Sequence, residues 1–182
     1  MLSYNLKPVD PSEIVKAPID EILAACHLYH WDVLIVGDGS GSQCDNACGW
    51  SSVLIDRETQ NRRLFGGHAN AGSVNFAEAM PFIQAMTWYD HFYGQHRNKD
   101  KIGLCDVHIV TDSQTIANMG NQAVTRKQVS RALTHLTSFI AAYMKLKYRF
   151  TWHWIPRNEF QLTEIVDRLS KQHRVTSQLT KK

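Results

Sequence analysis

Apolar residues along the chain form five short runs of the kind that make β-strands. Three of them, residues 32–38, 50–56 and 61–66, are separated by turns rich in Gly, Ser, Asn and Asp, which predicts a three-stranded meander. A fourth run covers residues 107–111. In the fifth, residues 148–154, aromatic and polar residues alternate with the period of two that is typical of a strand.

Between these runs, apolar residues recur at three- and four-residue steps, which is the spacing of one helix face. This spacing predicts helices over residues 75–93, from Ser113 to about Gly120, from Thr125 to Tyr143, and over a last segment whose apolar stripe leaves out Asp167. Pro81 predicts a kink or a later start of the first of these helices, because proline has no backbone N–H. The order β-β-β-α-β-α-α-β-α predicts a mixed α/β layer fold.

The N-terminal part of the chain differs from the rest in its pattern. Residues 1–30 are expected to form an extension, made of an irregular arm and a short helix with an apolar face over residues 19–26. Residues 31–175 form the α/β domain, and residues 176–182 a basic tail. With 182 residues, 43% of them hydrophobic, the chain is long enough for one sizeable core.

Composition excludes several classes of protein. No apolar run approaches the roughly 18 residues that a membrane span requires, and the first residues lack the basic start and apolar stretch of a secretory signal. The four cysteines are too few and too scattered for a disulfide framework, and their spacing does not fit a zinc site. These features predict a protein of the reducing cytoplasm.

Charge is distributed unevenly along the chain. Residues 1–60 contain three Lys or Arg and nine Asp or Glu, whereas residues 121–182 contain twelve Lys or Arg and three Asp or Glu. A basic C-terminal third suits a polyphosphate partner such as a nucleic acid. A solvated surface rich in lysine and arginine is the alternative interpretation.

Four acidic residues lie where strands and helices would direct them to one point. Asp38 and Asp112 close two β-branched runs, and Glu78 and Asp167 lie in helix-period segments. Clustered carboxylates repel one another unless cations neutralise them, and such hard oxygen ligands suit Mg²⁺ or Mn²⁺. The pattern therefore predicts a metal site. Taken singly, each acid is also compatible with turn chemistry or a solvated helix position.

Four motifs in a fixed order carry a resemblance to a known family. They are DGS at 38–40, VNFAE leading to Glu78, TDSQ at 111–114, and WIPRN followed by VDRLSK near the C-terminus. In this order the chain resembles ribonuclease H type 1 and its superfamily over about residues 31–173. The last motif is closest to the subgroup whose fifth strand ends in a Val-Pro-Arg type motif.

The resemblance implies a fold, a reaction and a set of ligands. The fold would be a ribonuclease-H-like five-stranded mixed sheet flanked by helices, with residues 31–175 as the catalytic domain. The family binds two Mg²⁺ ions and cleaves the RNA strand of RNA–DNA hybrids. Two ions about 4 Å apart can hold both the attacking water and the leaving oxygen of a phosphodiester. Asp38 would then contact both metals, Glu78 and Asp112 one, and Asp167 the other, with Glu164 as the alternative fourth ligand.

The resemblance also implies substrate contacts. Asn46, Asn75 and Gln114 match positions that touch the minor groove of the hybrid, where 2′-hydroxyls distinguish RNA from DNA. Arg157 is a candidate phosphate contact, and the basic start of the helix from Thr125 is a candidate for part of the substrate handle, through Arg126, Lys127 and Arg131. Many family members place a His in the loop after the fifth strand, but residues 155–160 contain none.

Two other functions fit the same residues. A ribonuclease-H-like DNA nuclease or Holliday-junction resolvase would use the same carboxylates, and a dimeric resolvase would need an interface such as the apolar face of residues 19–26. A nucleic-acid-binding module without catalytic activity would no longer gather metal. The sequence is compatible with a monomer and with a dimer.

Overall fold

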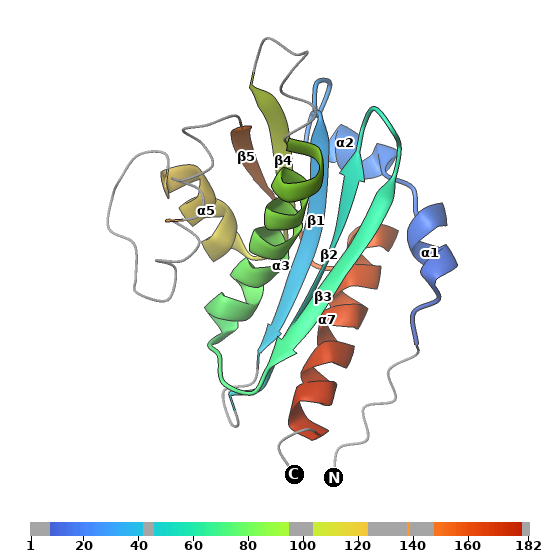
Figure 1. Ribbon diagram of the computed structural model, residues 1–182. Coiled ribbons are helices and arrows are strands. Elements are labelled where there is room, and N and C mark those ends of the chain that lie inside the picture. Colours follow the sequence, from blue (N-terminus) through green and yellow to red (C-terminus); the bar gives the residue numbers. More distant parts are fainter. Residues whose placement is uncertain (1–7, 42–45, 95–103, 124–137, 139–147, 180–182) are drawn as a thin grey trace.

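Five strands form one mixed sheet in the order β3-β2-β1-β4-β5 (Figure 1). The computed structural model describes residues 8–41, 46–94, 104–123, 138 and 148–179. The predicted five-stranded mixed sheet is confirmed. The strands are β1 (Val33–Gly41), β2 (Cys48–Asp56), β3 (Arg62–Ala69), β4 (Cys105–Thr111) and β5 (Tyr148–Trp154).

The register of the central strands brings two predicted ligands to one edge of the sheet. Strands β1, β2 and β3 are antiparallel, whereas β4 runs parallel to both β1 and β5. The β1–β4 pairing runs from Val33 opposite Val107 to Val36 opposite Val110. The same offset places Asp38 across from Asp112, just beyond the last paired residues, at the carboxyl ends of two parallel strands.

Helices cover both faces of the sheet (Figure 1). Helix α3 (Val74–Tyr89) lies on one face, mainly over β1 and β2, and continues into a π-helical turn, η1 (Asp90–Gly94). Helix α5 (Gln114–Ala123) packs on β5 and β4 on that same face. Helix α7 (Gln161–Leu179) lies on the opposite face, over β1, β2 and β3. The sheet therefore separates two hydrophobic cores.

Pro81 lies inside α3 without delaying its start. The helix begins at Val74, where the side chain of Ser73 accepts a hydrogen bond from the backbone N–H of Phe76. The carbonyl of Pro81 accepts a hydrogen bond of 2.9 Å from the Ser52 hydroxyl on β2. Of the two predicted alternatives the later start is wrong, because capping by Ser73 and packing on the sheet stabilise the first turns. The kink stays a prediction.

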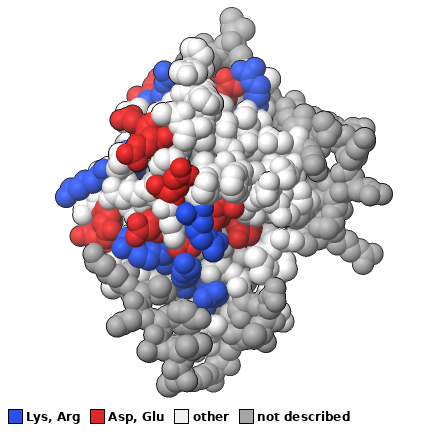
Figure 2. Space-filling model, turned by 180° about the vertical axis from the view of Figure 1, so that it is seen from behind, with Lys and Arg blue, Asp and Glu red and all other residues white. Residues whose placement is uncertain are grey.

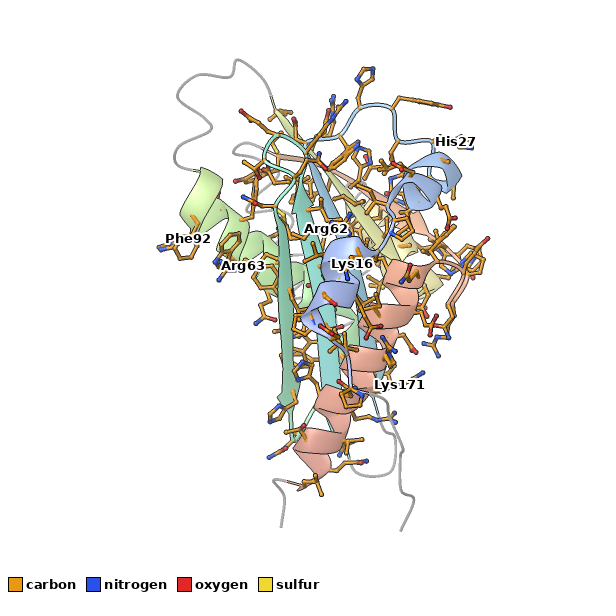
Figure 3. All side chains as sticks on the ribbon, turned by 90° about the vertical axis from the view of Figure 1, so that its right-hand side faces the viewer. Lys16, His27, Arg62, Arg63, Phe92 and Lys171 are labelled. Carbon is orange, nitrogen blue, oxygen red and sulfur yellow. The ribbon has the colours of Figure 1, made fainter. Side chains whose placement is uncertain are left out.

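The N-terminal extension contains two short helices, α1 (Pro11–Lys16) and α2 (Asp20–Ala25), instead of one. Ala17 and Pro18 separate them, because a residue before proline is disfavoured in helical conformation. The guanidinium of Arg62 on β3 donates to the carbonyl oxygens of Ile14 and Ala17 at the end of α1 (Figure 3). Both helices and the residues between them contribute buried side chains to the core beneath α7: Ile14, Ala17, Ile19 and Ile22.

The C-terminal helix extends further than predicted. Helix α7 includes residues 176–179, which the pattern assigned to the basic tail, and Ser177 is buried against β3, where its hydroxyl donates to the carbonyl of Ala69. The predicted helix from Thr125, with its basic residues, lies outside the described residues except for Ser138, which is helical. Among the described residues, none of the helices combines the length and apolar character that crossing a bilayer requires.

Candidate active site

Asp38 is the most buried of the predicted ligands, with a relative exposure of 3%. It lies near the end of β1 and faces α7, where its Oδ2 atom accepts a hydrogen bond of 2.5 Å from the Ser170 hydroxyl. Its neighbours Gly37 and Gly39 face α3 on the other side of the sheet. A β-strand presents successive side chains to opposite faces, so the DGS motif offers a carboxylate to one helix and bare backbone to the other.

Gly39 explains how Glu78 reaches Asp38. A Cβ atom at Gly39 would collide with the peptide that joins Ala77 to Glu78, so only glycine allows α3 to approach β1 this closely. The backbone N–H of Gly39 also donates a hydrogen bond to the Glu78 carboxylate. The close approach of helix and strand therefore places Glu78 beside the end of β1.

Three carboxylates meet at this point. Asp38, Glu78 and Asp112 each offer an oxygen atom within 4.8 Å of the others. Asp112 follows β4, and its residue is half-buried, whereas the other two are buried. Because these residues are separated by 34 to 74 positions along the chain, the folded sheet and helix bring them together.

Asp167 lines a small pocket together with two members of this cluster, Asp38 and Asp112. The pocket is lined by residues from β1, β4, α7 and the loop after β5, including Asp38, Asp112, Asn158 and Asp167. Asp167 is only 6% exposed, although it was predicted to lie off the apolar stripe of α7. It belongs to a polar stripe beside that apolar one, which the sequence pattern did not reveal: Thr163, Asp167, Ser170 and Ser177 are all buried.

Two cationic side chains balance part of this negative charge. The Nε atom of Arg157 lies 2.6 Å from Asp112 Oδ2, and its Nη2 atom lies 3.9 Å from Asp38 Oδ1. The Nζ atom of Lys171 lies 2.6 Å from Asp167 Oδ2, one helical turn along α7. On the face that carries α7, basic and acidic groups are interspersed rather than gathered into a patch of one sign (Figure 2).

Burial and mutual repulsion strongly favour the neutral forms of two carboxyl groups. Burial, followed by the charge of Asp112, raises the pKa of Asp38 to about 8. Burial, followed by the charges of Asp38 and Asp112, raises the pKa of Glu78 to about 9. Without an added cation, the site therefore resists full ionisation.

These pKa values predict how the stability of the metal-free protein depends on pH. Between about pH 4 and pH 8, Asp38 and Glu78 are protonated in the folded protein and ionised in the unfolded chain, so unfolding releases protons and stability falls as pH rises. We expect the free energy of unfolding in EDTA to decrease from pH 7 to pH 9. Burial lowers the pKa values of His108 and His153 below the ordinary value of 6.5, so from pH 7 to pH 9 these histidines add little to the dependence.

Chemical denaturation in EDTA at pH 7, 8 and 9 measures this dependence. In the Asp38→Asn variant one of the two titrating groups is absent, so the decrease should be smaller than in the wild-type protein. A stability that is constant or rises over this range in the wild-type protein would show that these carboxylates are already ionised in the fold.

The donor set fits a divalent cation. One oxygen of each predicted ligand is buried and has no hydrogen-bond partner among the described residues; these atoms are Asp38 Oδ1, Glu78 Oε2, Asp112 Oδ1 and Asp167 Oδ1. Buried oxygens without a donor are costly, and a hard cation with oxygen ligands satisfies them while neutralising their charge. The residues present can therefore hold metal.

The predicted substrate contacts lie in loops and at helix starts. Asn46 is exposed in the turn between β1 and β2, and its carbonyl accepts a hydrogen bond from the Gly72 N–H. Asn75 is half-buried in the first turn of α3, and Gln114 is exposed at the start of α5. Of the four predicted substrate contacts, Arg157 is the one that directly contacts the carboxylates.

His153 and His173, the histidines on either side of the loop after β5, contact other parts of the sheet. His153 Nε2 is 2.9 Å from His108 Nδ1, so the two imidazoles pair across β5 and β4. His173 packs against Gly66 on β3.

The sequence motifs did not predict two residues of the site. Asn158 lines the pocket, and the Ser170 hydroxyl donates a hydrogen bond to Asp38. The signal for Ser170 was its position three residues after Asp167, on the same face of α7.

No protein-family model matches this chain, and no curated protein is similar in sequence.

Structure comparison finds many solved proteins with the same fold. The N-terminal RNase H domain of Rv2228c from Mycobacterium tuberculosis matches with a TM-score of 0.64 at 17% identity, over 84% of this chain and 100% of that chain. RNase H1 from Halobacterium salinarum matches with a TM-score of 0.58 at 16% identity, over 79% and 98%. LC11-RNase H1 in complex with an RNA/DNA hybrid matches with a TM-score of 0.60 at 18% identity, over 80% and 99%. The predicted ribonuclease-H-like fold is thereby confirmed.

Proposed function

We propose that this protein is a metal-dependent endonuclease that hydrolyses the RNA strand of RNA–DNA hybrids. One observation carries the proposal: oxygens of Asp38, Glu78 and Asp112 converge within 4.8 Å in a ribonuclease-H-like fold. Solved structures with this fold include a ribonuclease H bound to an RNA/DNA hybrid. The buried oxygens without a hydrogen-bond donor explain why such a site would take up Mg²⁺, or Mn²⁺ in its place.

The metal ligands in this proposal are the four carboxylates. Asp38, Glu78 and Asp112 would hold divalent cations where their oxygens converge, and Asp167 would add a ligand from the adjacent pocket. Bound divalent ions would supply an activated water and charge stabilisation for an in-line phosphodiester displacement. The protein's own part is to hold the four carboxylates around the cations and to limit the access of bulk water, since three of the four residues are buried.

Arg157 is placed to bind a phosphate of the substrate. Its guanidinium is 56% exposed and pairs with the Asp112 carboxylate, on the solvent side of the cluster. Once cations neutralise Asp112, this guanidinium can turn to an anionic substrate, for which its planar array of donors is well suited. Asn46, Asn75 and Gln114 are proposed to contact the minor groove of the hybrid, where amide groups can hydrogen-bond 2′-hydroxyls.

The loop after β5 offers no histidine to protonate the leaving group. In the absence of such a side chain, we propose that solvent provides this proton and that turnover is modest.

We also propose a cytoplasmic location, because the scattered cysteines do not suit a disulfide framework.

The identity of the fourth ligand is tested by two substitutions on α7. We expect Asp167→Asn to lose nearly all hybrid cleavage and Glu164→Gln to retain most of it. The reason is burial: Asp167 lines the pocket with Asp38 and Asp112, whereas Glu164 is exposed to solvent. Initial cleavage rates of both variants at saturating Mg²⁺ measure the difference, and the opposite ranking would assign the fourth ligand to Glu164.

The proposed function is tested by a cleavage assay with several substrates. End-labelled RNA–DNA hybrid, duplex RNA, duplex DNA and a four-way DNA junction are incubated with the protein in Mg²⁺, with Asp112→Asn as the control. We expect cleavage of the RNA strand of the hybrid, dependent on Mg²⁺ and lost in the control. Cleavage of the junction alone would favour a resolvase, and hybrid binding without cleavage a binding module.

A further inference from the structure

Ser170 makes a contact that the four predicted ligands do not explain. The residue is fully buried on α7, and its Oγ atom lies 2.5 Å from Asp38 Oδ2 and 2.9 Å from the carbonyl oxygen of Asp167. A hydroxyl has a single proton to donate. When Asp38 is ionised, as metal ligation requires, the carboxylate is the stronger acceptor and the proton belongs to that bond.

The position of this hydroxyl is fixed by the packing of α7 on β2. A Cβ atom at Gly49 would collide with the backbone of Ser170 and Arg174, so the helix lies directly on the strand there. One turn earlier, the Ser51 hydroxyl donates a hydrogen bond of 2.6 Å to the carbonyl of Val166. These two contacts fix the distance between the α7 backbone and β2. The buried Ser170 side chain faces Asp38 from this fixed backbone.

The two carboxylate oxygens of Asp38 differ in their contacts. Oδ2 is engaged by Ser170, whereas Oδ1 has no hydrogen-bond donor among the described residues and is 3.9 Å from the Arg157 guanidinium. A carboxylate held through one oxygen cannot rotate freely, so its other oxygen keeps its direction. Groups that orient a metal ligand in this way typically change metal affinity about 10- to 100-fold when they are removed.

We infer that Ser170 is a positioning residue that orients the Asp38 carboxylate for metal binding and couples it to the helix that carries Asp167. The inference rests on the proposed function, because it assigns Ser170 a role at the same metal site. It goes beyond that function by adding a residue that contacts neither metal nor substrate.

Ser177 provides a matched control on the same helix. It lies seven residues after Ser170, is also fully buried, and its hydroxyl contacts Ala69 O and Asn70 Oδ1, each at 2.7 Å. Ser177→Ala therefore removes the same atom from the same interface between α7 and the sheet, but away from the carboxylates.

The test compares Mn²⁺ binding by calorimetry in the wild-type protein, Ser170→Ala and Ser177→Ala, with hybrid cleavage measured in parallel. We expect Ser170→Ala to raise the Kd for Mn²⁺ about 10- to 100-fold and to reduce the rise in Tm that Mn²⁺ produces. Ser177→Ala should keep the wild-type Kd. If Ser170→Ala does not fold, Ser170→Cys replaces it, because a thiol is a weak donor of similar size.

An unchanged Kd in the Ser170 variant would overturn the inference, as would an equal rise in both serine variants, which would indicate general loosening of α7. Wild-type protein that binds Mn²⁺ but cleaves none of the nucleic acids would refute the proposed nuclease, while the Kd values would still decide the role of Ser170. Wild-type protein that binds no Mn²⁺ would overturn both.

Discussion

Replacing Asp38 by Asn is expected to lower the rate of hybrid cleavage at least about 10³-fold and, at the same time, to make the metal-free protein more stable. Asp38 is the carboxylate between Glu78, Asp112 and Asp167, so its loss removes the central ligand. Its charge is also costly in the fold, because burial and neighbouring carboxylates raise its pKa to about 8. An amide of the same shape avoids that cost, with an expected gain of about 1–3 kcal/mol at pH 8.

Both effects are measured on one protein preparation. Single-turnover cleavage in Mg²⁺ reports the loss of activity, and thermal unfolding at pH 8 in EDTA reports the gain in stability. Glu164→Gln is the control, since it removes one negative charge from an exposed site on α7 and should change neither quantity appreciably. Cleavage at the wild-type rate in Asp38→Asn would exclude Asp38 as a metal ligand, and reduced stability would show that its charge is favourable in the fold.

Removal of residues 1–30 is expected to prevent stable folding. The segment inserts Ile14, Ile19, Ile22 and Leu28 into the core beneath α7, each less than 9% exposed. Burial of one such side chain contributes roughly 1.5–3 kcal/mol, so the four together are comparable to the 5–15 kcal/mol that stabilises a typical domain. The ion pair between Glu13 and Arg168 would be lost as well.

A pair of single substitutions in the full chain also tests whether residues 1–30 contribute to stability, without removing the segment. Ile22 is fully buried and Val15, in the same extension, is 68% exposed. We expect Ile22→Ala to lower the free energy of unfolding by about 2–5 kcal/mol and Val15→Ala to change it by less than about 0.5 kcal/mol. Urea unfolding in EDTA measures both, and a truncated protein that unfolds at the wild-type urea concentration would show that the extension is an independent arm.

The strands were the most predictable part of the fold. Each of the five predicted strand runs lies within a few residues of an observed strand, because alternation and β-branched residues mark strands locally. The extension and the end of α7 were predicted less well. Whether Ala17 and Ser177 are buried depends on contacts with Arg62 and Ala69, about 45 and 108 residues away, and local periodicity carries no information on such contacts.

For the site, the order of motifs predicted Asp38, Glu78, Asp112 and Asp167 as candidates, and the structure brings oxygens of the first three within 4.8 Å of one another. The order of motifs did not show which cation pairs with Asp112, so Arg157 had no predicted carboxylate partner before the structure placed its Nε atom 2.6 Å from Asp112 Oδ2. Serine is common on helices, and a position three residues after Asp167 does not by itself distinguish a solvated Ser170 from one that contacts a carboxylate 132 residues away.

The sequence by itself determined the chemical types and the order of the elements: a mixed sheet, helices on its faces, and acids at the ends of strands. Only the tertiary structure decided the distances, because the approach of α3 to β1 at Gly39 and of α7 to β2 at Gly49 sets how closely the carboxylates meet. Side-chain period and residue chemistry are local properties of a chain. Convergence within 4.8 Å depends on strand register and helix packing, which arise only when distant segments bury their apolar faces together.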